Sequence, residues 1–102
     1  MLKLENNVKV YIPLVKNLHE ISNIITRDMT KEFGGVTLYP SKGFWLDDND
    51  IMIEDTINVA VSFTDKSIEE IKRIISKYVE IMKMDLKQDA VSIEINNILY
   101  II

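Results

Sequence analysis

Apolar and polar positions alternate near the start of the chain. Val8, Val10 and Ile12 are each separated by one residue of a different character, and this period of two is typical of a strand with one buried face. Pro13 ends the pattern, because proline removes a backbone donor from the ladder. We therefore expect a first strand over residues 8–12.

From Leu14 the apolar spacing changes to three and four residues, which predicts a helix that runs to about Phe33. Its apolar stripe consists of Leu14, Leu18, Ile21, Ile25, Met29 and Phe33. Asn17 and Glu20 have the spacing of a capping box, and the Gly34-Gly35 pair supplies a residue that tolerates positive φ at the C-terminal end.

Two short segments rich in β-formers follow, residues 36–39 and 44–46. The residues between them, Pro40 to Gly43, have the composition of a turn, so a short hairpin is predicted here. Asp47 to Asp50 forms a second turn-like segment before the next strand.

A long strand is predicted over residues 51–63, because its large apolar residues share one parity. These residues are Ile51, Ile53, Ile57, Val59, Val61 and Phe63. Asp55 has the same parity, so we expect a bulge between Glu54 and Ile57, the alternative being an acid buried with a partner. The other face of the sheet would then be mixed and polar, with Tyr11, Thr56, Asn58, Ala60 and Ser62.

Ser67 and Glu70 form a clearer capping box at the start of a second helix, which its apolar spacing carries to about Leu86. Residues 91–95 again alternate, Asn96-Asn97 is typical of a tight turn, and residues 98–102 complete a terminal hairpin.

This order predicts one α+β domain over residues 1–102. The arrangement is a ferredoxin-like β-α-β-β-α-β fold with two helices on one face of a mostly antiparallel sheet and an extra hairpin. The long strands and the uncharged C-terminal run leave a free sheet edge. We therefore expect the chain to associate with copies of itself as a homo-oligomer.

Composition narrows the function classes. The 102-residue chain is 47% hydrophobic and 27% charged, with a net charge of -4, so nothing favours nucleic-acid binding. The absence of Cys removes thiol catalysis and thiolate metal sites and fits a cytoplasmic protein. No apolar run has the length of a membrane span, so no membrane partner is expected.

Candidate catalytic groups are sparse. His19 is the only imidazole, so no His triad can form, and its simplest interpretation is a boundary residue of the first helix. The acidic run that starts at Asp47 lacks the glycine and the terminal acid of a calcium loop, since Met52 and Asn58 stand at those positions. We predict no catalytic residues, no metal ligands and no cofactor, although Glu54 with magnesium remains an enzymatic alternative.

The segment from Gly34 to Glu54 is the most distinctive part of the sequence. It holds every glycine in the chain and the only tryptophan, Trp45. Glycine lets a ligand approach the backbone, and an exposed indole can stack on a planar group. The predicted ligand-binding residues are Gly34, Gly35, Thr37, Gly43, Trp45, Glu54, Arg27 and Lys42. In the structural alternative, the glycines cap a helix and form a turn while Trp45 fills the core or a subunit contact.

The pattern Phe33-Gly34-Gly35-x-Thr37, then Gly43-x-Trp45, then Glu54, resembles small proteins of bacteria, phages and mobile elements. It is also distantly similar to a larger domain-of-unknown-function family with a Gly-x-Thr…Gly-x-Trp…Glu signature. The resemblance covers about Phe33 to the C-terminus. It implies an α+β fold and a phage or mobile-element origin. It carries no established activity.

The sequence therefore favours a non-enzymatic module that binds a small planar or nucleotide-like ligand. In a phage or mobile element, such a module would sequester a host signalling nucleotide. The alternative is a protein-interaction module that inhibits a host enzyme through its acidic surface or its sheet edge.

Overall fold

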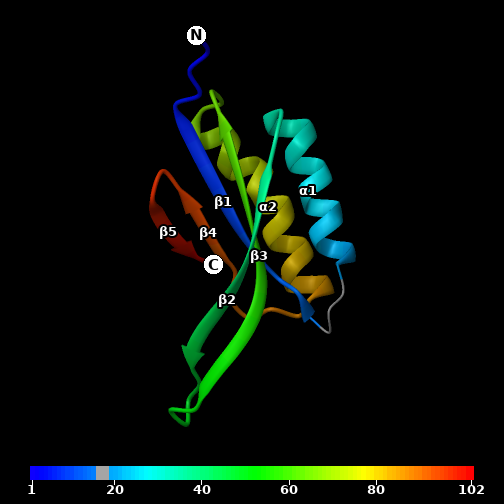
Figure 1. Ribbon diagram of the computed structural model, residues 1–102, viewed down its shortest axis with the longest axis vertical. Helices are drawn as coiled ribbons and strands as arrows, with labels where there is room; N and C mark the ends of the chain where they lie inside the picture. The colour runs from blue at the N-terminus through cyan, green and yellow to red at the C-terminus, as the bar shows by residue number, and fades with distance from the viewer. Residues whose placement is uncertain (16–18) are drawn as a thin grey trace.

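A computed structural model covers the chain and describes residues 1–15 and 19–102. Figure 1 shows two helices and a five-stranded sheet. The elements are β1 (Asn6–Pro13), α1 (Glu20–Phe33), β2 (Thr37–Leu46), β3 (Met52–Thr64), α2 (Ile68–Asp85), β4 (Ser92–Ile95) and β5 (Ile98–Ile101).

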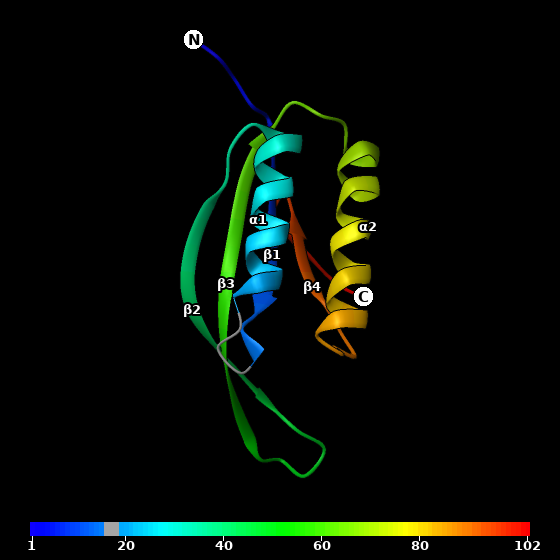
Figure 2. The same ribbon diagram turned by 90° about the vertical axis from the view of Figure 1, so that its right-hand side faces the viewer.

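The strands are antiparallel in the order β2-β3-β1-β4-β5. Both helices lie on one face of this sheet, where α1 contacts β3 and α2 contacts β1. Figure 2 shows this face, with the two helices towards the viewer. The predicted α+β class and the β-α-β-β-α-β order are confirmed, and β5 is the added strand. None of the helices in the described part of the chain is long and apolar enough to cross a membrane.

The ends of α1 match the sequence only in part. The helix begins at Glu20 with His19 at its N-cap, whereas Leu14, expected inside the helix, precedes it and bonds through its N–H to the carbonyl of Thr56. Asn17 and Leu18 lie outside the described residues. The C-terminal end is as predicted, because Gly34 takes φ +88° and donates to the carbonyl of Thr30.

The second helix and the terminal hairpin agree with the pattern. The Ser67 hydroxyl accepts from the backbone N–H of Glu70 at 3.2 Å, so the serine half of the predicted capping box forms. Asn96 and Asn97 both take positive φ between β4 and β5, as a two-residue hairpin turn of the I′ type requires.

The predicted hairpin within residues 36–46 is wrong. β2 runs without a break through Pro40, which pairs with Asn58 of β3. Because β2 is an edge strand, the missing N–H of Pro40 removes no ladder bond from a second neighbour. The acidic turn that follows is as predicted, and Asp47 Oδ1 stabilises it by accepting from the N–H groups of Asn49 and Ile51.

The expected bulge in β3 is also absent. Gly43 pairs with Asp55 and Ser41 with Ile57 in an uninterrupted register. Asp55 shares the parity of Ile57 without strain, because at this point the strand has left the body of the protein and the acid is exposed. β1 ends at Pro13, opposite Ile57, so the hairpin formed by residues 42–56 has no β1 partner. Apart from the bond from the Leu14 N–H to Thr56, its two strands pair only with each other. We call this projecting hairpin the arm (Figure 1).

The two faces of β3 are the reverse of the prediction. The helices cover the small and polar residues of β3, Asn58, Ala60, Ser62 and Thr64, which are buried. The larger residues Ile57, Val59, Val61 and Phe63 lie on the other face, which we call the open face. The register gives the reason: Val8, Val10 and Ile12 of β1 stand opposite Ser62, Ala60 and Asn58, so all share the helix side.

The core lies between the helices and this inner face. On α1 it includes Ile25, Met29 and Phe33, and on α2 it includes Ile71, Ile74, Ile75, Tyr78, Val79 and Met82. The Asn58 amide donates to the Ser22 hydroxyl of α1 at 2.9 Å, so both of these buried polar groups are paired where α1 crosses β3.

Candidate functional site

The open face is hollowed where the arm leaves the body. A pocket of about 740 Å³ lies between the base of the arm, β1, residues 87–91 and the β4–β5 hairpin, and we call it the arm pocket. An adjoining hollow of about 640 Å³ continues along β3, and the two share Tyr11, Gly43 and Ile57. Ligand sites in proteins commonly have volumes of roughly 300–1,000 Å³.

One wall of the arm pocket is a hydrogen-bonded network across β1 and β4. The Tyr11 hydroxyl donates to Glu94 Oε1 at 2.7 Å, and Lys9 Nζ lies 3.4 Å from Glu94 Oε2. The register explains the contact, because Lys9 and Glu94 are direct cross-strand partners and Tyr11 lies two residues further along the same face. Both carboxylate oxygens of Glu94 therefore have a donor.

This network changes the acidity of its members. The hydrogen bond from Tyr11, helped by Lys9, lowers the pKa of Glu94 despite the opposing effect of burial. The same hydrogen bond, together with burial and the negative charge of Glu94, raises the pKa of Tyr11 to about 12. At neutral pH the wall therefore presents an ionised carboxylate and a protonated phenol.

The arm forms the opposite wall. Trp45 Nε1 donates to Asp55 Oδ2 at 2.8 Å, and the indole is 52% exposed. Between these residues and the body stands Gly43, which pairs with Asp55. A Cβ at residue 43 would lie 3.2 Å from Ile57 Cδ1, so glycine leaves the room that the Ile57 side chain occupies.

The pocket combines apolar surface with negative charge. Its charged lining residues are three acids, Asp55, Asp89 and Glu94, and one base, Lys87. Apolar groups, among them Leu99 and Ile101 of β5, line the rest. In the described part of the chain, no three His, Cys, Asp or Glu side chains are grouped so that they could hold a metal ion. The arrangement suits a ligand that is partly aromatic and carries positive charge.

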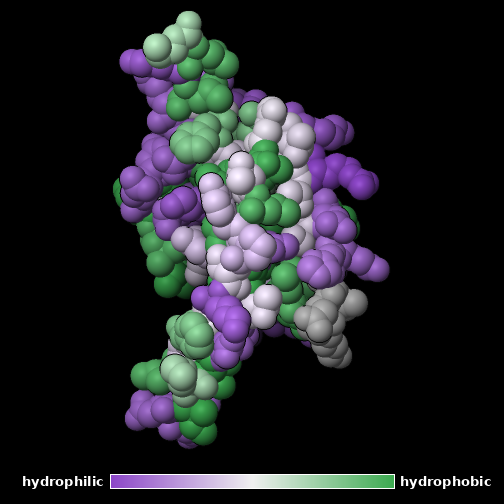
Figure 3. All heavy atoms as spheres, in the orientation of Figure 1, coloured by the Kyte–Doolittle hydropathy of each residue, from purple (hydrophilic) through white to green (hydrophobic). Residues whose placement is uncertain are grey.

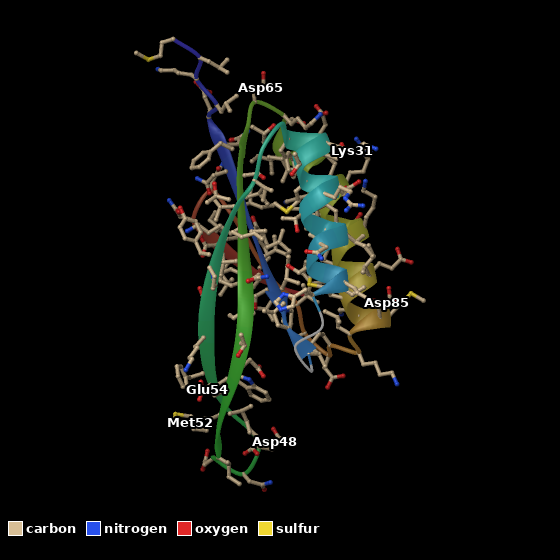
Figure 4. The ribbon with its side chains drawn as sticks, turned by 45° about the vertical axis from the view of Figure 1, so that its right-hand side comes forward. Lys31, Asp48, Met52, Glu54, Asp65 and Asp85 are labelled. Atoms are coloured by element: carbon tan, nitrogen blue, oxygen red, sulfur yellow. The ribbon has the colours of Figure 1, made fainter. Side chains whose placement is uncertain are left out.

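Two of the predicted ligand residues, Gly43 and Trp45, lie in this pocket. Trp45 does not fill the core, contrary to that part of the structural alternative. Lys42 and Glu54 form an exposed salt bridge at 3.2 Å, but Glu54 points to the other side of the arm from Trp45. Figure 4 shows Glu54 and Met52 along the arm.

The remaining predicted residues lie elsewhere. Gly34 and Gly35 connect α1 to β2 at the far end of the sheet, near Lys31 in Figure 4, and Thr37 is paired with Val61 there. Trp45 lies eight residues after Thr37 along β2, a distance of roughly 26 Å at the usual rise per residue. Arg27 is exposed on α1, on the helix side of the sheet. The structure therefore divides the predicted group among three places.

Sequence reasoning missed Tyr11, Lys9, Asp55 and Glu94 as site residues. Asp55 carried a signal, because an acid interrupted an apolar parity, and that signal was interpreted as a bulge. Tyr11 and Glu94 carried none, since 83 positions separate them and each fits an ordinary alternating strand.

No known protein-family model and no curated protein match the sequence. Solved structures do match the fold. A phage SAM lyase in complex with S-methyl-5′-thioadenosine superposes with a TM-score of 0.75 at 15% identity, covering 100% of this chain and 94% of the other. A phage SAM lyase in the apo state gives 0.73 at 12% identity with the same coverage.

These matches correct one expectation. Both of these solved structures are of phage SAM lyase, an enzyme, and this contradicts the prediction of a non-enzymatic module. The neighbour's ligand is a thioadenosine, a nucleoside derivative of the kind that the sequence suggested. The resemblance to the FGG-x-T family stays a prediction, as does the alternative of an inhibitor of a host enzyme.

Proposed function

We propose that this chain is a lyase that cleaves S-adenosylmethionine and releases S-methyl-5′-thioadenosine, and that the reaction takes place in the arm pocket. The observation that carries the proposal is the ionised Glu94, held by Tyr11 and Lys9 in an apolar pocket on a fold shared with phage SAM lyase. S-adenosylmethionine is a sulfonium cation with a planar base, which fits the acidic and aromatic lining.

The reaction breaks the bond between the sulfonium sulfur and Cγ of the methionine portion. Both electrons of that bond go to sulfur, which becomes a neutral thioether. Cγ takes a new electron pair from the substrate's own carboxylate, or a neighbouring carbon loses a proton to a base. The lowered pKa of Glu94 makes it a weak base, which favours the first route over proton abstraction.

Glu94 then acts through its charge. A carboxylate near the sulfonium attracts the substrate, and the donors on both of its oxygens fix its position before the substrate arrives. Leu99 and Ile101 add apolar surface beside this carboxylate.

In the deciding experiment, purified protein is incubated with S-adenosylmethionine, and the S-methyl-5′-thioadenosine released is measured by chromatography and mass spectrometry. Wild type should release it catalytically, and Glu94→Gln should lose about tenfold to a thousandfold in kcat/KM. Glu80→Gln, an exposed acid on α2, is the matched control and should be unchanged. Absence of product from the wild-type protein would rule the proposal out.

We also propose that copies of the chain associate through the arm. Phe44, Leu46 and Met52 are 57%, 64% and 66% exposed, and the cross-strand register puts them on one face of the arm. Figure 3 shows hydrophobic surface at this projecting end. An exposed apolar cluster of this kind marks an association surface, and a second copy of the chain would cover it.

Light scattering should report an oligomer in wild type and a smaller species in the Leu46→Lys, Met52→Lys double variant. A wild-type monomer would exclude this association.

A further inference from the structure

Each wall of the arm pocket pairs an aromatic donor with a carboxylate. On the arm wall the half-exposed indole of Trp45 donates to Asp55, which is itself exposed. On the body wall Tyr11 donates to Glu94, whose other oxygen is held by Lys9 from outside the pocket lining. The two carboxylates therefore differ in how many acceptor sites they leave for a ligand.

The arm wall is built as a platform. Gly43 and Trp45 are neighbours on the open face of β2. Because Gly43 has no side chain, it leaves the indole uncovered on the side that faces the pocket. Ile57 continues the apolar surface from the body up to Gly43. The hydrogen bond to Asp55 limits the rotation of the indole. A purine can stack on the exposed face of this indole, as bases do on aromatic side chains.

Asp55 can contact the ligand as well as Trp45. An ionised carboxylate has about four acceptor sites, and one indole N–H uses only one of them. Asp55 is exposed and lines the pocket, so the remaining acceptor sites are accessible to hydroxyl donors. Adjacent hydroxyls on a ribose ring are donors at the right separation for one carboxylate.

We propose that Trp45 and Asp55 are the nucleoside-recognition residues of the pocket: the base stacks on Trp45, the ribose hydroxyls donate to Asp55, and the sulfur faces Glu94. This orientation rests on the proposed lyase function and adds to it the residues that determine specificity. It predicts that the chain selects adenosyl ligands over methionine or simple sulfonium ions, and ribosides over deoxyribosides.

Trp45 is the only tryptophan, so its fluorescence reports the contact directly. Titration with S-methyl-5′-thioadenosine should quench the emission, whereas methionine should not. Calorimetry should show that Trp45→Ala lowers the affinity for this ligand by about 5- to 150-fold. Trp45→Phe should keep most of the affinity. Trp45 is exposed, so the variants should fold, and circular dichroism checks this.

Asp55→Asn should lower the affinity for S-methyl-5′-thioadenosine until it is similar to the affinity for the 2′-deoxy analogue. The variant should therefore lose the preference for the riboside. Asp48→Asn, on the arm's turn and outside the pocket, is the matched control and should bind as wild type does (Figure 4). Binding without quenching, or equal affinity for wild type and Trp45→Ala, would overturn the orientation.

Turnover separates this proposal from the lyase function. If wild type cleaves S-adenosylmethionine and Trp45→Ala keeps the same KM, the orientation is wrong and the lyase stands. If wild type binds the thioadenosine with quenching and cleaves nothing, the orientation is supported and the lyase function fails.

Discussion

The Tyr11 hydroxyl donates to Glu94 at 2.7 Å across two strands that lie at opposite ends of the sequence. The contact exists because β4 pairs with β1 in the interior of the sheet, which places residues 9, 11 and 94 on one face. It joins the pocket's main carboxylate to the body of the protein.

Tyr11→Phe should change the pH profile of the reaction. Without the phenol, Glu94 loses the main cause of its lowered pKa, so the carboxylate becomes protonated at a higher pH. The acid limb of kcat/KM should therefore move to higher pH. Tyr39→Phe is the control, because Tyr39 lies on the open face beside the adjoining hollow and outside the arm pocket. An unmoved acid limb in Tyr11→Phe would show that Glu94 does not set it.

Tyr11 should also affect stability in alkali. Its pKa rises from 10.0 to about 12 on folding, so the stabilisation is fully present below pH 10 and is lost as pH rises towards 12. Urea unfolding should show a smaller decline over this interval in Tyr11→Phe than in wild type. The tyrosinate absorbance of the folded protein should also lose a late-titrating component in the variant. Identical titration curves would contradict the assignment.

The acidic side of the stability profile should depend on Asp28, which joins α1 to α2. Asp28 Oδ2 accepts from the Tyr78 hydroxyl at 2.5 Å and from Lys77 Nζ at 3.3 Å. The hydrogen bond from Tyr78 is the main cause of the lowered pKa of Asp28. A lowered carboxyl pKa stabilises the fold above the unfolded value near 3.8, and that contribution is lost as pH falls through the folded value.

Asp28→Asn should remove this part of the acid dependence. The free energy of unfolding should be lower than that of wild type at neutral pH, and the gap should narrow as pH falls below about 4. Glu20→Gln at the start of α1 serves as the control. A constant gap between wild type and Asp28→Asn at all pH values would contradict the prediction.

The assignment of the sheet faces can be tested at two neighbouring residues. Ala60 is fully buried beneath the helices, so Ala60→Leu should cost about 1–3 kcal/mol by overpacking. Val59→Leu, one residue away on the open face, should cost less than about 0.5 kcal/mol. Chemical denaturation measures both. A larger loss in Val59→Leu would mean that the helices lie on the other face.

Most of the secondary structure could be predicted because it depends on neighbours in the chain. The Ser67–Glu70 capping box, the glycine that ends α1 and the Asn96-Asn97 turn each need only local geometry. The apolar spacing of the second helix likewise predicted its end near Leu86, which is the C-cap residue of α2. Where a local rule failed, at Pro40, the reason was positional: an edge strand tolerates a residue that a turn also favours.

The sequence by itself determined the order of elements, the fold class and the two possible faces of each strand. Only the tertiary structure decided which face of β3 the helices cover. Cross-strand pairing puts Val10 beside Ala60, and the small side chains of β3 let α1 pack closely, so the larger residues Val59 and Val61 lie on the open face. The same pairing brings Tyr11 to Glu94 and leaves the arm without a β1 partner, so the site depends on register.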